Sequence, residues 1–150
     1  MNPPLTALEL KKQLVAQGFE VYRTIGNQVL LAERVRDNLI MDANVAAFAG
    51  ELFVARASYR AQQSDFHGAA DAELFARARQ MATEALARGY REVDRTVVPI
   101  VDPGDRTRTL DTWYEVTMEL SVTTLDELIA ELRYLLACKK VALAGRGATG

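Results

Sequence analysis

The residues from 112 to 122 alternate between apolar and polar side chains almost without exception. Tyr114, Val116, Met118 and Leu120 occupy every second position, and polar side chains fill most of the positions between them. Successive side chains of a β-strand point to opposite faces, so a period of two residues is typical of a strand with one buried face. This segment therefore predicts a half-exposed strand, which restricts the fold more than any other stretch of the chain.

Five further segments have the composition of strands: residues 19–25, 28–34, 39–45, 52–61 and 91–101. Gly26-Asn27 is suited to a tight hairpin turn, although it could instead bend one long strand. Residues 36–38 indicate a second turn. Residues 102–111 begin with Asp-Pro-Gly-Asp and predict a loop longer than a minimal hairpin needs. Pro99 cannot donate to a ladder, so its strand is expected at a sheet edge or with a bulge there.

Three segments predict helices. Two of them begin with a capping box, in which a threonine and a glutamate three residues later satisfy each other's free backbone N–H groups. These boxes are Thr6 with Glu9 and Thr124 with Glu127. The third segment, 70–88, has apolar residues at helical spacing with charged residues opposite, and Gly89 follows it.

Together these segments predict a single α+β domain over residues 1–150. Its expected order is α-β-β-β-(β)-α-β-β-α, with three helices and an antiparallel sheet of five to six strands. Residues 1–4 and 144–150 have little to pack against, so both tails are expected to fray.

Composition and charge exclude several classes of protein. The formal net charge is −2, and arginines are interleaved with acids, which argues against binding to nucleic acid. No run approaches the ~20 apolar residues of a membrane-spanning helix. The first residues lack the pattern of a secretory signal, and a single cysteine, Cys138, fits a reducing compartment. We therefore expect a soluble cytoplasmic protein that binds neither membrane nor nucleic acid.

No motif for catalysis, metal binding or nucleotide binding is present. The single His67 and single Cys138 form no pair at metal-ligand spacing, and neither glycine-rich nucleotide motif occurs. We expect no cofactor, no metal and no catalytic residue, and His67 is most simply a loop residue. The alternative is a small-ligand enzyme or sensor on the concave sheet face near Tyr59, Asp65 and His67, where His67 would move protons.

The only tryptophan, Trp113, stands on the polar side of its strand. One interpretation is cross-strand packing against Arg95 or Val97, which needs no partner. The other is that Trp113 anchors a second protein chain, since tryptophan, tyrosine and arginine dominate interface hot spots.

Charged residues are expected to accompany Trp113 on the same face. Glu115 and Glu119 would stand opposite Arg91 and Arg95 as a cross-strand charge ladder. The exposed edge near Pro99 is a second candidate surface. This sheet region predicts partner-binding residues at Trp113, Glu115, Arg95 and Pro99.

The last predicted helix is unusually rich in large aliphatic residues: Leu125, Leu128, Ile129, Leu132, Leu135 and Leu136. Ordinary core packing explains this stripe. The alternative is that part of it, including Leu132 and Leu136, or the edge near Pro99 closes a two-fold homodimer.

The element order, size and acidic charge from Thr6 to Lys140 resemble the class I type III secretion chaperone fold, which also occurs in related bacterial regulatory proteins. The resemblance implies a homodimer that holds extended segments of a partner by strand addition and apolar grooves, without catalysis. The expected function is thus a non-enzymatic protein-binding module of chaperone or adaptor type, whose partner is another protein chain.

Overall fold

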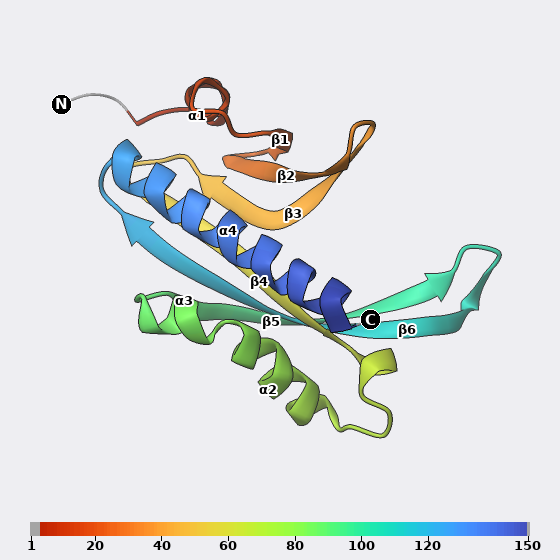
Figure 1. Ribbon diagram of the computed structural model, residues 1–150. Helices are drawn as coiled ribbons and strands as arrows, with labels where there is room; N and C mark the ends of the chain where they lie inside the picture. The colour runs from red at the N-terminus through yellow and green to blue at the C-terminus, as the bar shows by residue number, and fades with distance from the viewer. Residues whose placement is uncertain (1–3, 150) are drawn as a thin grey trace. The chain divides into compact units, whose positions relative to one another are not determined.

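The computed structural model describes the backbone of residues 4–149 and the side chains of residues 4–34 and 36–138. The fold of this described part is α+β, as expected. It consists of one antiparallel sheet of six strands together with helices (Figure 1). Its elements are α1 (Ala7–Ala16), β1 (Val21–Ile25), β2 (Gln28–Arg36), β3 (Leu39–Phe48), β4 (Phe53–Gln62), the 3₁₀ turn η1 (Gln63–Asp65), α2 (Asp71–Met81), α3 (Thr83–Ala87), β5 (Arg91–Asp102), β6 (Asp105–Val122) and α4 (Leu125–Thr149). Among the residues that the structure describes, no helix is both long and apolar enough to cross a membrane.

The strands of the sheet follow the order β1-β2-β3-β4-β6-β5. Hairpins join β1 to β2 and β5 to β6, and consecutive strands from β1 to β4 pair with their neighbours. The strand β5 is the last of the order, which confirms the edge position expected from Pro99. The register of β5 also shifts close to that proline, between Ile100 and Val101.

The chain divides into two compact units, and the first consists of Met1–Ala57 together with Leu120–Gly150. In this unit, α4 packs against β3 (Figure 1). The capping box of α1 is present, with the backbone N–H of Glu9 donating to Thr6 Oγ1 at 3.2 Å. The second box is present too, since Glu127 donates to Thr124 Oγ1 at 3.1 Å. Large side chains that are completely buried in this unit are Leu10, Leu14, Val29, Leu31, Val45, Leu128, Leu132 and Leu135.

The second unit is Ser58–Glu119, and it contains α2, α3, β5 and most of β6. Tyr114 of β6 lies against Phe75 of α2, edge to face, with ring centroids 5.2 Å apart. The Tyr114 hydroxyl donates to Asp71 Oδ1 at 2.8 Å, and this hydrogen bond is the main cause that raises the pKa of Tyr114. Val116 and Met118 complete the buried face of β6.

The predicted helix over 70–88 is broken in two at Ala82, which ends α2 and precedes α3. Thr83 takes part in the break, because its hydroxyl donates to the backbone carbonyl of Gln80 at 2.6 Å. Side-chain bonds of this kind offer the backbone an alternative to continuous helix. The described residues therefore form four α-helices in place of the three expected.

Two of the three predicted turns have the expected form. Gly26-Asn27 forms the turn between β1 and β2, and Gly26 has a φ of 58°. A positive φ at the first central residue is what a type II′ hairpin turn requires. The turn between β2 and β3 lies at Asp37 and Asn38.

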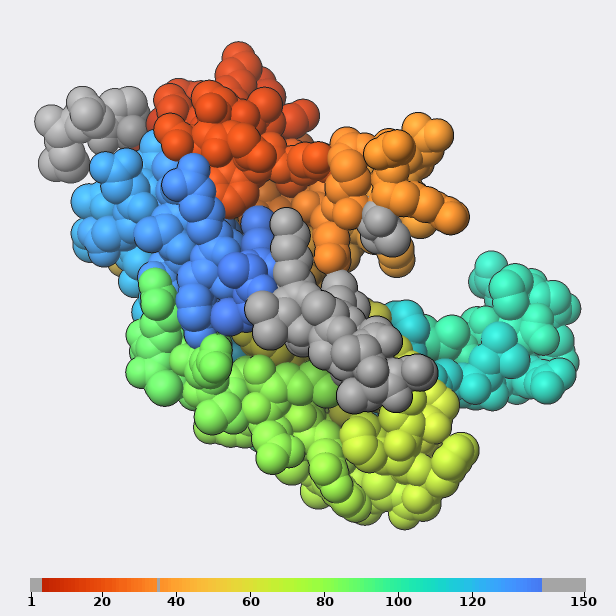
Figure 2. Space-filling model, viewed as in Figure 1, coloured from red at the N-terminus to blue at the C-terminus, as the bar shows by residue number. Residues whose placement is uncertain are grey.

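The prediction of a long loop over residues 102–111 is wrong. Asp102 pairs with Asp105 across a two-residue turn, and β6 begins directly at Asp105. Asp102 Oδ1 accepts from the backbone N–H of Gly104 at 2.8 Å and stabilises that turn. The end of the β5–β6 hairpin, around the turn from Asp102 to Asp105, projects from the second unit (teal in Figure 2), and we call it the finger.

The two tails expected to fray are residues 1–4 and 144–150. Residues 1–3 and 150 lie outside the described residues. The backbone of 144–149 continues α4 as far as Thr149. Fraying of this last stretch stays a prediction.

Candidate protein-binding surface

The alternation along β6 places Trp113 as expected. Tyr114, Val116 and Met118 are buried. Trp113, Glu115 and the other polar residues from 113 to 119 are only partly buried, on the opposite face. The sequence therefore predicted the direction of Trp113 correctly.

Trp113 is covered by an arginine, but from the other neighbouring strand. The guanidinium of Arg60, on β4, lies 3.7 Å from the centroid of the Trp113 ring. Arg60 also donates to Glu115 Oε1, from Nε at 2.9 Å and from a terminal nitrogen at 2.5 Å. Because β6 lies between β4 and β5, residues of either strand can reach Trp113. Arg60 thus ties Trp113 and Glu115 together, in a three-residue group that we call the Arg60 cluster.

The charge ladder expected between β5 and β6 is half right. Glu119 pairs in register with Arg91. Glu115 lies opposite Thr96, and Arg95 lies opposite Val116. Arg95 is therefore shifted by one position from the residue opposite Glu115. It points to the other face of the sheet, because neighbouring positions of a strand alternate between faces.

Asp111 is a second centre of polar contacts that the sequence analysis missed. Its carboxylate accepts from the Ser64 backbone N–H at 3.1 Å, from the Ser64 hydroxyl at 2.8 Å and from the Thr112 N–H at 2.8 Å. Partial burial alone would raise the pKa of Asp111, but hydrogen bonds from Ser64, Thr112 and the Trp113 side chain outweigh it and lower the pKa. Asp111 therefore ties the turn after β4 to the base of the β5–β6 finger.

Replacing Asp111 with asparagine is expected to destabilise the protein by about 1–2 kcal/mol at pH 7, because an amide cannot accept all of these hydrogen bonds. A carboxylate whose pKa is lowered by folding stabilises the protein above its unfolded pKa of about 3.9, and that contribution is lost as the pH falls through the folded value. The difference between wild type and Asp111→Asn should thus shrink below about pH 4. Urea unfolding at a series of pH values measures it.

The control for this experiment is Asp65→Asn, which removes the same charge from the exposed 3₁₀ turn. We expect it to change the free energy of unfolding by no more than about 0.5 kcal/mol. Equal effects of the two substitutions, or an Asp111→Asn effect that does not depend on pH, would contradict the role of Asp111.

A hollow of about 590 Å³ lies beside this polar centre. It is lined by Gln63, Ser64, His67, Gly68, Thr109, Leu110, Asp111 and Thr112. His67 is exposed and belongs to it, whereas Tyr59 and Asp65 are not part of the lining. Tyr59 is buried in the face of β4 opposite to Arg60. Over the described part of the chain, no three His, Cys, Asp or Glu residues are grouped to hold a metal ion.

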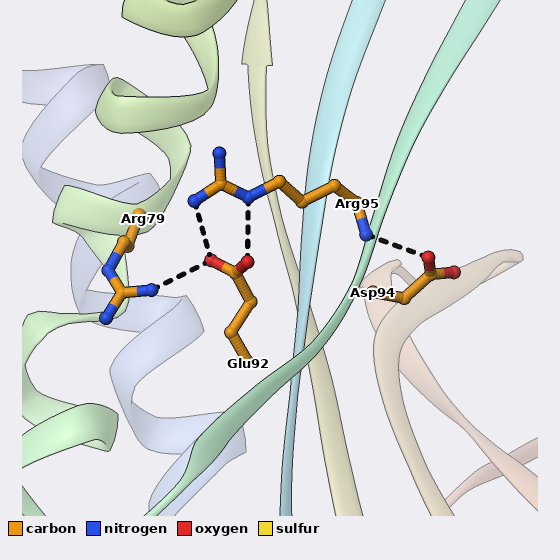
Figure 3. Close-up of polar contacts among 4 residues, drawn as sticks. All are labelled: Arg79, Glu92, Asp94 and Arg95. Carbon is orange, nitrogen blue, oxygen red and sulfur yellow. Dashed lines mark hydrogen bonds and ion pairs between the residues drawn. The ribbon is translucent and has the colours of Figure 1, made fainter.

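The edge strand β5 carries Arg95 and Pro99. Figure 3 shows that Arg95 is engaged within the chain, since it donates to both carboxylate oxygens of Glu92 at 2.7 and 3.2 Å. Arg79 of α2 donates to the same carboxylate at 2.9 Å. The hydrogen bond from Arg95 is the largest cause that lowers the pKa of Glu92, and Arg79 adds to it against the opposing effect of burial.

Exposed apolar side chains gather on the same edge strand. Val93, Val97 and Val101 are 46%, 46% and 39% exposed, and Pro99 between them is exposed too. The outer side of β5 is not paired with any strand that the structure describes. This combination of an unpaired edge and exposed valines makes β5 the strongest candidate surface.

The two leucines of α4 differ in accessibility. Leu132 is completely buried, whereas Leu136 is partly buried. Leu132 therefore has no accessible side-chain area with which another chain could make contact in this conformation. Of the two, only Leu136 presents apolar area at the surface.

Arg60 is the other residue that the sequence analysis missed. Its position among the polar sites of a predicted strand indicated a side chain on the partly exposed face. Only the adjacency of β4 and β6 brings it to Trp113. Comparison of the chain with protein-family models, with curated proteins and with solved structures found no match.

Proposed function

We propose that this protein is a non-enzymatic, cytoplasmic protein-binding module of chaperone or adaptor type. It recognises an extended segment of a partner chain by strand addition at the outer side of β5. The observation that carries the proposal is that β5 ends the sheet while it exposes Val93, Val97 and Val101. Main-chain hydrogen bonds at such an edge supply affinity, and side chains along it supply specificity.

The form of the edge supports this proposal. Natural sheets protect unused edges with charged side chains, prolines, bulges or covering segments. The strand β5 has bulges near both ends and one proline, but its register against β6 is continuous from Asp94 to Ile100. That stretch is long enough to pair with a short segment of another chain.

The resemblance to class I type III secretion chaperones points in the same direction. Its implied homodimer belongs to the proposal, with Leu136 on α4 as an apolar contact. The Arg60 cluster contributes less to partner binding than the edge, because the ring of Trp113 already lies against Arg60. Glu115 is likewise occupied by Arg60.

The hollow beside His67 supports a second candidate function, a sensor or enzyme for a small ligand. His67, Ser64 and Asp111 are among the residues that line it. Ser64 donates to the carboxylate of Asp111, and the lowered pKa of that carboxyl makes it a weak base for activating the hydroxyl for catalysis. The hollow therefore favours ligand binding over nucleophilic catalysis.

Site-specific photocrosslinking in the source cell tests the proposed function. A photoreactive residue is placed at Val97 and, as a matched control, at Ala76, which is exposed on α2 of the same unit. We expect a defined protein adduct at position 97 that is absent at position 76. Identical adducts at both positions, or none at position 97, would refute strand addition at β5.

A further inference from the structure

The charged side chains of Glu92, Asp94 and Arg95, at the start of β5, are engaged within the chain. Glu92 is held by Arg79 and Arg95, as Figure 3 shows. Asp94 accepts from the backbone N–H of Arg95 at 2.8 Å and from the Thr96 hydroxyl at 3.3 Å. Arg91, the first residue of β5, stands opposite Glu119 in the register. Three carboxylates and three guanidinium groups are thus gathered here, so this end of the edge has no net charge to attract a charged partner.

The remainder of the pairing stretch has no charged side chain at all. Residues 96–101 read Thr-Val-Val-Pro-Ile-Val. Val97 is exposed on one face, and Val98 and Ile100 are partly buried on the other. Val98 lies opposite Trp113 in the register, which extends the apolar surface inward from the edge.

We infer that the segment that adds to β5 is uncharged and carries aliphatic, preferably β-branched, residues at alternate positions. This inference rests on the proposed function and names the chemistry of its partner. The segment is about as long as the continuous register from Asp94 to Ile100. Pro99 lacks a backbone N–H, which weakens pairing at that end of the segment.

The physical reason is the cost of an unpaired charge. An added strand brings its side chains directly beside those of β5, at cross-strand distances of about 4.5–5.5 Å. A lysine or glutamate beside Val97 or Val98 would lose water without gaining a partner. Glu92 and Arg95 are already paired with each other, and the carboxylate of Asp94 already accepts two hydrogen bonds. Aliphatic side chains would instead bury the exposed valines, and so the edge discriminates against charge by leaving it unpaired.

Binding of designed peptides tests this inference. Three fluorescein-labelled peptides share polar flanks and a seven-residue core in which threonine alternates with valine, with lysine or with glutamate. The full chain is titrated into each, and fluorescence anisotropy reports the Kd. We expect the valine peptide to bind at least tenfold more tightly than either charged peptide.

Two variants make the test specific to β5. Val97→Lys should weaken the binding of the valine peptide and strengthen the binding of the glutamate peptide, because it places a positive charge beside the incoming strand. Ala76→Lys adds the same charge on α2 and should leave the order of affinities unchanged. A valine peptide interrupted by proline should bind poorly to every form, since it cannot pair as a strand.

The outcomes separate the two proposals. Equal or tighter wild-type binding of a charged peptide overturns the inference, as does a failure of all three peptides to bind. In both cases a crosslink at position 97 would leave the proposed function standing. If Val97→Lys does not change the affinity for the valine peptide, the peptide does not bind at β5 and the inference is wrong. If no crosslink forms at position 97, the proposed function itself is wrong.

Discussion

Replacing Leu132 with alanine is expected to lower the free energy of unfolding by about 3–5 kcal/mol, which is the largest effect that we predict for a single substitution. Leu132 lies in the first third of α4 and is 0% exposed. Truncation removes apolar side-chain atoms from a fully packed site, and the cavity left behind adds to the lost transfer free energy. Urea unfolding monitored by circular dichroism measures the change.

Leu136→Ala is the matched control, because it removes the same atoms one turn later on the same helix from a partly buried site. We expect a loss of no more than about 2 kcal/mol for this variant in the isolated chain. If Leu132→Ala cost less than about 1 kcal/mol, Leu132 would not be the core residue that its burial indicates. A loss that depends on protein concentration for Leu136→Ala would instead support a homodimer contact at that residue.

Arg60→Ala is expected to destabilise the protein by about 1–3 kcal/mol. The substitution removes the guanidinium that lies on the Trp113 ring, and it leaves Glu115 without its cation. Both charged side chains are mostly buried, with 28% and 20% exposed, so solvent screens this pair less than a surface pair. Trp113 is the only tryptophan, so its fluorescence should shift to the red in the folded variant as the ring gains water.

Arg34→Ala is the control for Arg60. Arg34 also forms an ion pair at 2.9 Å, with Glu20, but the two side chains are 49% and 42% exposed. We expect a loss of about 1 kcal/mol or less, as for other surface pairs. An Arg60→Ala loss no greater than that of Arg34→Ala, with tryptophan fluorescence unchanged, would mean that the Arg60 cluster does not hold Trp113.

Local chemistry explains why most elements could be predicted. Capping boxes and turn residues act over three or four positions, and the structure contains both boxes and the Gly26-Asn27 turn where they were expected. The finger is the exception. Asp102-Pro103-Gly104-Asp105 is strong turn chemistry, but strand pairing on either side of the turn depends on the register between β5 and β6.

Two backbone features had no clear local signal. Ala82 divides the predicted helix although neither glycine nor proline is near it, and alanine is the best helix former. Asn44 has a φ of 57° within β3, close to a shift in the register between Leu30 and Ala32 of β2. Asparagine tolerates this conformation better than most residues, but the need for it comes from the partner strand.

The candidate site, too, could be predicted from the sequence only in part. The alternation along β6 correctly predicted the direction of Trp113, and Pro99 correctly predicted an edge strand. The partners of these residues could not be predicted, because they come from distant parts of the chain. Arg60 and Glu115 are 55 positions apart, and Ser64 and Asp111 are 47 apart.

The sequence by itself thus determined the type of nearly every element and the face on which each side chain of β6 from Trp113 to Leu120 lies, since both depend on a few neighbouring residues. The tertiary structure alone decided that β6 lies between β4 and β5, and with it that Arg60, not Arg95, covers Trp113. It also decided that Arg95 is committed to Glu92 and does not face Glu115. Strand order is set by the packing of segments far apart in the chain, and no local pattern records it.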